Sequence, residues 1–224
     1  MRIRKLHRWP SSYREARNLQ IELARQLVLE FPPVEINLIA GADASYVKGS
    51  KEVFAGVVVM KFPDLQIIEQ ASYKSQVNFP YIPGLLSFRE SPVLLEAFAK
   101  LRSTPDVAIF DGHGIAHPRG FGLASHMGMW LNLPAIGCAK KNLVGTYKEV
   151  ENSKGAYSLI NYEGKVVGAA LRTRTNVRPV FISPGYKIDL PNSLRIILSS
   201  VKKYRIPEPI RQAHIFVNQL RAES

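Results

Sequence analysis

Two of the chain's five aspartates stand where an apolar strand is expected to end, and that position suggests metal chemistry. Asp43 closes the apolar run 38–42, and Asp111 closes the run 107–110. A buried carboxylate is costly unless a cation or a set of donors compensates it. Oxygen ligands without cysteine partners favour Mg²⁺, or Mn²⁺ in its place, over zinc. Either acid alone could be an ordinary turn residue, but two such acids on strands that can lie side by side favour a shared cation.

Two further residues could complete such a site, and each has a plainer interpretation. Glu90 is placed near the start of a helix, where an acid is favourable by itself, but it could also be a third carboxylate at the metal. His214 lies among Ile210, Ala213 and Val217, a spacing that predicts an inward-facing position on a helix. From the residues alone, a histidine there is interpreted as part of the core and not as a catalyst.

The composition favours a polyanionic partner. The 224 residues include 30 Lys and Arg against 18 Asp and Glu, which gives a formal net charge of +12. Such a surplus suits DNA, RNA or an acidic membrane surface, although a basic soluble protein without such a partner would look the same. No apolar run reaches the roughly 18 residues of a membrane-spanning helix, so a membrane partner is not expected.

The cysteine content and the first residues favour an intracellular setting. Cys138 is the only cysteine, so no disulfide within the chain and no multi-cysteine zinc site can form. Residues 1–10 are basic but lack the apolar core of a signal peptide. A reducing, cytoplasmic location is therefore expected.

Hydrophobic periodicity predicts the elements that would position these residues. It favours an α/β fold, with an antiparallel meander first and parallel strands in the middle of the chain. No internal repeat or linker divides the sequence, so residues 1–224 are expected to form one domain. The predicted helices are 12–31, 85–101 with an interruption at Pro92, 120–131, 193–204 and 208–220, and the predicted strands are 37–46, 53–62, 66–77, 106–111, 135–139, 157–160 and 166–171.

Five segments, in this order and spacing, resemble the endonuclease V family, the deoxyinosine 3′ endonucleases. They are GADASY at 41–46, PYIPGLLSFRE at 80–90, DGHGIAHPR at 111–119, GCAKK at 137–141 and RQAH at 211–214. Any one of these segments would be modest evidence, whereas their combination over residues 40–220 is highly specific.

The resemblance implies a ribonuclease H-like fold, in which a mixed sheet is flanked by helices. It implies hydrolysis of the second phosphodiester bond 3′ to a deaminated base such as hypoxanthine, leaving 3′-hydroxyl and 5′-phosphate ends. The expected partners are DNA that contains deoxyinosine and, as an alternative, RNA that contains inosine, acted on by a monomer.

The resemblance also assigns roles to individual residues. Asp43 and Asp111 correspond to the family's metal-binding acids, and Glu90 to its third acid. His214 corresponds to a histidine near the attacking water, which reverses the interpretation as a core residue. Lys140 corresponds to an active-site lysine, whose ammonium can stabilise the charge that develops on the phosphate.

The segment from Pro80 to Pro83 is predicted to read the base. Its two prolines stiffen the loop, so Tyr81 and Ile82 can form a fixed apolar wedge that fills the gap left by an extruded nucleotide. Without the resemblance, a rigid loop with a core tyrosine is about equally favoured.

The glycine-rich segment that begins at Gly112 could be a flexible loop, but the resemblance implies that it lines the base pocket through main-chain groups. Hypoxanthine and adenine present inverted donor and acceptor patterns, which backbone groups could distinguish. His117 is a candidate substrate contact. The basic run of Arg172, Arg174 and Arg178 either grips phosphates or forms a solvated face.

Two other functions remain open from the sequence. Another ribonuclease H-like nuclease would share the metal acids but would not need the wedge. A non-catalytic nucleic-acid-binding module of the same fold would not need Asp43, Glu90 and Asp111.

Overall fold

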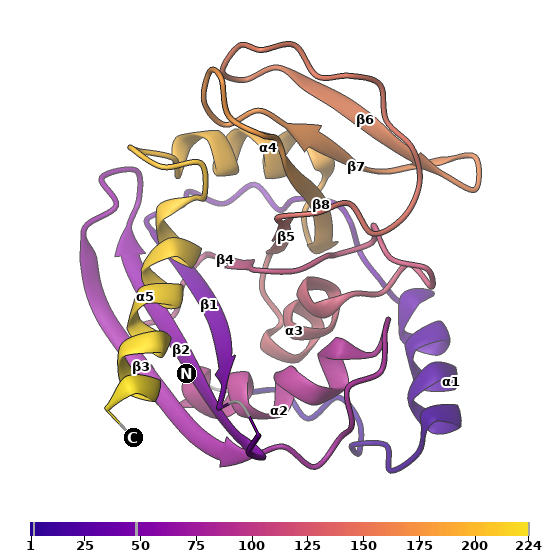
Figure 1. Ribbon diagram of the computed structural model, residues 1–224, viewed down its shortest axis with the longest axis vertical. Helices are drawn as coiled ribbons and strands as arrows, with labels where there is room; N and C mark the ends of the chain where they lie inside the picture. The colour runs from indigo at the N-terminus through magenta and orange to yellow at the C-terminus, as the bar shows by residue number, and fades with distance from the viewer. Residues whose placement is uncertain (2, 48, 224) are drawn as a thin grey trace.

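The computed structural model describes residues 1, 3–47 and 49–223. In this part of the chain, eight strands form one mixed sheet with helices on both faces (Figure 1). None of the described helices is both long and apolar enough to cross a bilayer. The elements in chain order are α1 (Tyr13–Ala24), β1 (Leu38–Tyr46), β2 (Glu52–Lys61), β3 (Ile67–Gln76), α2 (Leu86–Ala99), β4 (Val107–Phe110), α3 (Leu123–Leu131), β5 (Ala135–Ala139), β6 (Tyr157–Tyr162), β7 (Lys165–Leu171), β8 (Val180–Tyr186), α4 (Leu190–Ser199) and α5 (Glu208–Ala222).

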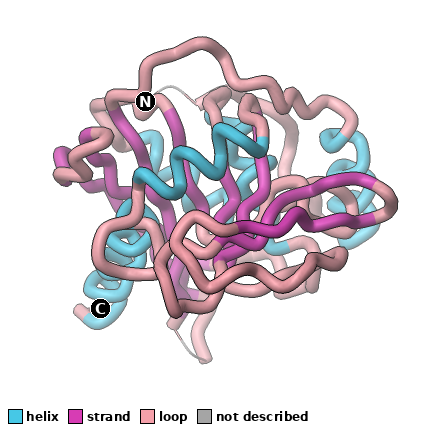
Figure 2. The backbone as a smooth tube through the Cα atoms, turned by 90° about the horizontal axis from the view of Figure 1, so that it is seen from above, coloured by secondary structure: helices cyan, strands magenta, loops and turns pink. Residues whose placement is uncertain are grey.

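The strand order explains how residues far apart in sequence can meet. The order is β3-β2-β1-β4-β5-β8-β7-β6. Strands β1, β4 and β5 are parallel neighbours, whereas β1–β2–β3 and the pairs beyond β5 are antiparallel. The predicted meander, the parallel centre and the mixed, ribonuclease H-like sheet are therefore confirmed. The β6–β7 hairpin lies at one end of the sheet in both views (Figures 1 and 2).

The core forms two layers because the central strands are buried on both faces. Alternate residues of a strand point to opposite faces. Thus Ala42 and Phe110 join the layer under α2 and α3, whereas Ile39 and Ile109 join the layer under α4 and α5. Burial on both faces is the reason that these strands read as nearly continuous apolar runs.

Helix α5 crosses β1 at a point where only glycine fits. A Cβ atom on Gly41 would lie 2.0 Å from the main-chain carbonyl carbon of Pro209. The first turn of α5 therefore rests directly on the backbone of β1. This close approach brings His214, on the next turn of α5, beside the end of β1.

Several predicted elements differ from the structure. Helix α2 runs from Leu86 to Ala99 without the interruption predicted at Pro92. The helix predicted over 12–31 begins as expected, with the Ser12 hydroxyl accepting from the Glu15 amide, but it ends at Ala24. Beyond it the chain is no longer helical, and the Val28 carbonyl accepts from the Lys187 amide at 2.6 Å. The spacing of Leu27 suggested a longer helix. In the structure Leu27 does pack against the core, but its backbone is not helical.

Strand β8 was not predicted, because Pro184 and Gly185 look like strand breakers. Pro184 pairs with Ile136 beside a register shift, and Gly185 is the extra residue between the partners of Ala135 and Ile136. Helix α4 begins at Leu190, three residues before the predicted start. Asp189 caps it by accepting from the Asn192 amide.

Candidate active site

The register of the central strands places the two predicted metal acids next to each other. Ala42 pairs with Phe110 in the parallel β1–β4 ladder, and the next residues are Asp43 and Asp111. The negative charge of Asp111 helps to raise the pKa of Asp43, after burial, which is the larger cause. The strand ends thus bring together two carboxylates that repel each other.

Glu90 adds a third carboxylate from the other side of this position. It is buried on α2, and its Oε1 accepts a hydrogen bond from the Tyr46 hydroxyl at 3.1 Å. Burial and then the charge of Asp43 raise the pKa of Glu90 to about 8, and Asp111 contributes in the same direction. The charges of Asp43 and Asp111 thus oppose ionisation of Glu90, and a cation would stabilise such a site.

The donor set fits a hard divalent cation that keeps part of its shell for other ligands. Among the described residues, no group of three His, Cys, Asp or Glu side chains forms a ready-made metal cage. Mg²⁺ commonly uses one or two carboxylates and completes its octahedron with water and substrate phosphate. Asp43 and Asp111 offer that number of ligands, and both side chains remain partly exposed.

His214 contacts the site from α5, although not in the predicted orientation. Ile210, Ala213 and Val217 form the inward face of the helix, whereas the His214 side chain is 55% exposed. The prediction of an inward-facing histidine is wrong, because the ring leans along the helix surface toward the end of β1. Its Nδ1 lies 2.7 Å from Oδ2 of Asp43.

Asn218 fixes the ring of His214 and was missed by the sequence analysis. Its Nδ2 lies 3.1 Å from Nε2 of His214, and its Oδ1 accepts from the Ser45 hydroxyl at 3.0 Å. If the amide donates to Nε2, the proton resides on Nδ1, which then donates to Asp43. The position of Asn218 four residues after His214, on the same side of a helix, is the only sequence signal for this contact.

Lys140 reaches the other acid from the end of β5. Its Nζ lies 2.5 Å from Oδ2 of Asp111. Burial lowers the pKa of Lys140, but the hydrogen bond to Asp111 and the nearby negative charges outweigh burial and raise it. The ammonium is therefore charged, and it brings a positive charge to this cluster. All five residues predicted to be catalytic meet here.

A cavity of about 180 Å³ opens beside the acids. It is smaller than the cavities that hold drug-sized ligands, which suits a single base. Gly112, the residue after Asp111, lines it, so the cavity adjoins the acid cluster directly. Its other walls come from the wedge loop (residues 80–84), the loops after β4 and β5, and helices α1, α2 and α3. The lining residues are Gln20, Tyr81, Ile82, Pro83, Gly84, Leu86, Ser87, His113, His117, Gly122, Leu123 and Leu143.

The wedge loop presents its aromatic residue to solvent. Tyr81 is 69% exposed, so the interpretation of a core tyrosine is wrong. Ile82 and Pro83 line the cavity beside it, while Pro80 is exposed at the start of the loop.

His117 lines the same cavity, but both of its ring nitrogens have partners in the protein. Nε2 lies 3.0 Å from the Gly84 carbonyl oxygen, and Nδ1 accepts from the Arg119 amide at 3.2 Å. Burial, with a smaller effect of Arg119, lowers the pKa of His117 to about 4, so the ring is neutral at neutral pH. A direct substrate contact by His117 remains a prediction.

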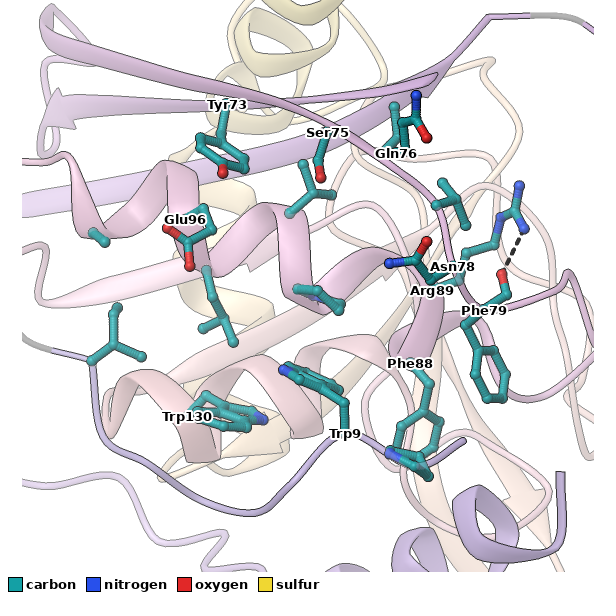
Figure 3. Close-up of a pocket in the computed structure, with 18 of the residues that line it drawn as sticks. Trp9, Tyr73, Ser75, Gln76, Asn78, Phe79, Phe88, Arg89, Glu96 and Trp130 are labelled. Atoms are coloured by element: carbon teal, nitrogen blue, oxygen red, sulfur yellow. Dashed lines mark hydrogen bonds between the residues drawn. The ribbon is translucent and has the colours of Figure 1, made fainter. Parts of the chain in front are cut away.

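A second cavity, of about 930 Å³, has a different lining. Figure 3 shows it between α2, the end of β3 and the N-terminal segment, with Trp9, Asn78 and Glu96 among its walls. Arg89 also lines it and donates to the Phe79 carbonyl oxygen at 2.8 Å. Of the described residues around this cavity, none belongs to the acid cluster.

Two arginines of the predicted basic run hydrogen-bond main-chain carbonyls within the protein. The guanidinium of Arg172 donates to the main-chain carbonyls of Glu151, Val177 and Val150. Arg174 donates to the carbonyl of Lys203. Arg172 therefore ties the loops around the β6–β7 hairpin together.

Comparison with known proteins identifies relatives of the whole chain. The sequence profile of the family Endonuclease V matches residues 21–215. The Endonuclease V of Dictyoglomus turgidum is 47% identical over 217 residues, which cover 97% of this chain and 94% of that protein.

Solved structures agree with the sequence relatives. The Endonuclease V of Bacillus subtilis superposes with a TM-score of 0.94 at 33% identity, covering 99% of this chain and 98% of the other. That of Ciona intestinalis, solved with a 24-mer DNA containing an inosine followed by a ribo-adenosine, gives a TM-score of 0.83 at 25% identity. The match covers 94% of this chain and 97% of the other.

Proposed function

The chain belongs to the endonuclease V family, and we propose that it cuts nucleic acid on the 3′ side of a deaminated base, above all hypoxanthine. The observation that carries the proposal is the adjacency of the acid cluster and a base-sized cavity, joined through Asp111 and Gly112. A nucleotide turned into the cavity would bring the backbone on its 3′ side toward the acids.

Mg²⁺, or Mn²⁺ as a substitute, would be held by Asp43 and Asp111. When bound, a divalent cation supplies positive charge to the phosphate and lowers the pKa of water. Glu90 is assigned as the third acid. A neighbouring positive charge lowers the pKa of a carboxyl group, which favours the ionised form of Glu90 in the working enzyme.

The remaining side chains hold protons and charge. His214, whose ring contacts Asp43 and Asn218, would hold the attacking water or exchange a proton with it. Lys140 provides an ammonium for the negative charge that develops on the phosphate. Hydrolysis of the second bond 3′ to the base would leave 3′-hydroxyl and 5′-phosphate ends.

Recognition is assigned to the cavity and the wedge loop. Pro80, Tyr81, Ile82 and Pro83 would fill the gap in the stack, while main-chain groups from Gly112 onward would read the edge of the base. The substrate proposed first is DNA that contains deoxyinosine, in line with the DNA present in the Ciona intestinalis complex. Inosine-containing RNA is the second candidate.

The test is a cleavage assay on four end-labelled strands that contain one inosine or one adenine, in DNA or in RNA, with Mg²⁺. The expected result is one cut at the second bond 3′ to inosine and none in the adenine strands. Cleavage of an RNA–DNA hybrid regardless of inosine would favour another ribonuclease H-like nuclease. Binding to inosine strands without any cut would favour a non-catalytic module.

A further inference from the structure

The carbonyl oxygen of Gly84, at the end of the wedge loop, lies within hydrogen-bond distance of three side-chain nitrogens. Nη2 of Arg119 lies at 2.7 Å, Nε2 of His117 at 3.0 Å and Nε2 of Gln20 at 3.1 Å. A carbonyl oxygen has two lone pairs, so three donors saturate it. Gln20, His117 and Arg119 together form the Gly84 clamp.

The clamp joins three segments that are distant in sequence. Gln20 is fully buried on α1, and its Nε2 also donates to the Phe121 carbonyl oxygen at 2.5 Å. Its Oε1 accepts from Nε of Arg119. Both ends of this buried amide are therefore paired, as a buried amide requires. Helix α1, the wedge loop and the loop after β4 are thereby held in one arrangement.

The geometry at Gly84 leaves little freedom. Its φ of 77° is in the left-handed region, which favours glycine. A Cβ atom there would lie 2.7 Å from Nη2 of Arg119. Beneath the loop, Ile82 and Phe79 pack on an apolar cluster that includes Ala16 of α1.

The other end of the wedge loop is held in a similar way. Arg89 donates to the Phe79 carbonyl oxygen at 2.8 Å, and its guanidinium lies 4.8 Å from the ring centroid of Tyr46, the residue that hydrogen-bonds Glu90. The segment 80–83 thus lies between two main-chain carbonyls, of Phe79 and Gly84, that each accept a hydrogen bond from an arginine.

We propose that Gln20, His117 and Arg119 are positioning residues for base recognition, which hold the wedge loop at a fixed place over the base cavity. This inference rests on the proposed function. A wedge can replace lost base stacking only if its loop keeps its position when the DNA binds. Tyr81 is largely exposed, so its own side chain does little to fix the loop. Loosening the clamp would therefore weaken recognition of the base while the acid cluster stays intact.

The structure also offers an alternative role for Arg119, because its guanidinium is only partly buried and the positive charge of Arg17 acts on it. In that case Arg119 would contact a substrate phosphate. The two roles differ in salt dependence, since each phosphate neutralised on duplex DNA contributes about −0.9 to the log–log slope of affinity against salt.

The experiment compares Arg119→Met, Gln20→Met and the double variant with the wild type. Arg25→Met is the matched control, because Arg25 is exposed at the end of the same helix, outside the site. The substrates are inosine-containing duplex and single-stranded DNA at several salt concentrations. Circular dichroism and urea unfolding verify that each variant is folded.

Each single variant is expected to lose about tenfold in kcat/KM on the inosine duplex, mostly through KM. The loss should be smaller on the single strand, where less stacking is broken. The double variant should resemble the single variants, because the residues act through one carbonyl. The salt slope and the Arg25→Met variant should match the wild type.

A salt slope weakened by about 0.9 in Arg119→Met would overturn the inference in favour of a phosphate contact. Equal losses on duplex and single strand, or losses that multiply in the double variant, would also overturn it.

A second readout is independent of cleavage. The Leu85 amide donates to the Ile82 carbonyl oxygen at 2.9 Å inside the wedge loop, and its hydrogen exchange should become about tenfold faster in folded clamp variants. Unchanged exchange would overturn the inference. If the wild type fails to cut inosine strands while exchange still accelerates, the proposed function fails and the clamp stands.

Discussion

Replacement of Tyr81 by alanine separates recognition from chemistry. The side chain is 69% exposed beside the base cavity and belongs to neither the acid cluster nor the Gly84 clamp. Its removal should therefore change the free energy of unfolding by no more than about 0.5 kcal/mol, the usual range for an exposed position. The acids and their partners should be unaffected.

The expected loss follows from the role of a wedge. Stacking of an aromatic ring on a base is worth about 1–3 kcal/mol. At 1.4 kcal/mol per factor of ten, this range corresponds to a loss of about five- to hundredfold in productive binding of an inosine duplex. Single strands have less stacking to break, so the loss should be smaller there.

The assay is a paired titration of wild type and Tyr81→Ala on inosine-containing duplex and single strand, with cleavage rates at saturation. At saturating substrate, Tyr81→Ala should cleave at nearly the wild-type rate. An equal loss on both substrates would mean that Tyr81 contacts the substrate without acting as a wedge. No loss on either substrate would refute the assignment of the loop to recognition.

Three further predictions concern charge and stability. Affinity for duplex DNA should fall steeply with salt, by about 0.9 log units per tenfold salt for each phosphate bound, and a flat response would mean that the net charge of +12 is not used on nucleic acid. Burial holds the pKa of His126 well below 6.5, so the ring binds a proton more readily in the unfolded chain. The free energy of unfolding should therefore fall as the pH drops below about 6.5. His126 contributes up to about 1.4 kcal/mol per pH unit to this fall. Urea unfolding across that range measures the slope, which should flatten in His126→Phe. Arg172→Met, which leaves three carbonyls without their cationic donor, should lower the free energy of unfolding by about 2–4 kcal/mol, whereas a change under 0.5 kcal/mol would contradict the structural role.

The sheet was predictable where local pattern and burial coincide. The apolar runs before Asp43 and Asp111 indicated buried strands, and the alternation of strand and helix indicated their parallel pairing. Adjacency of the two acids follows from those facts. Strand β8 was not predictable, because Pro184 and Gly185 are tolerated there only through a register shift.

Long-range contacts were beyond the sequence. Nothing local indicates that Tyr46 hydrogen-bonds Glu90, or that Gln20 on α1 binds the carbonyl of Gly84. The direction of His214 was predicted wrongly, because helical spacing assigns a residue to a face but does not reveal a partner beside that face. The end of α1 at Ala24 depends on the later chain, which supplies the partner of Val28.

The catalytic roles of individual residues remain predictions, and the family resemblance carried most of them. Periodicity alone left Glu90 as an ordinary first-turn acid and His214 as a core histidine. In the structure both residues lie near Asp43, which supports their assignment to the active site.

Asp43 and Asp111 are proposed to act in cleavage, whereas a separate cavity recognises the base. The most direct test is to measure binding and cleavage of one inosine-containing strand by wild type, Asp43→Asn and Asp111→Asn at saturating Mg²⁺. Both variants should fold and keep part of their affinity for the inosine strand, with cleavage reduced to the background of the assay. Near-normal turnover in either variant would contradict the account.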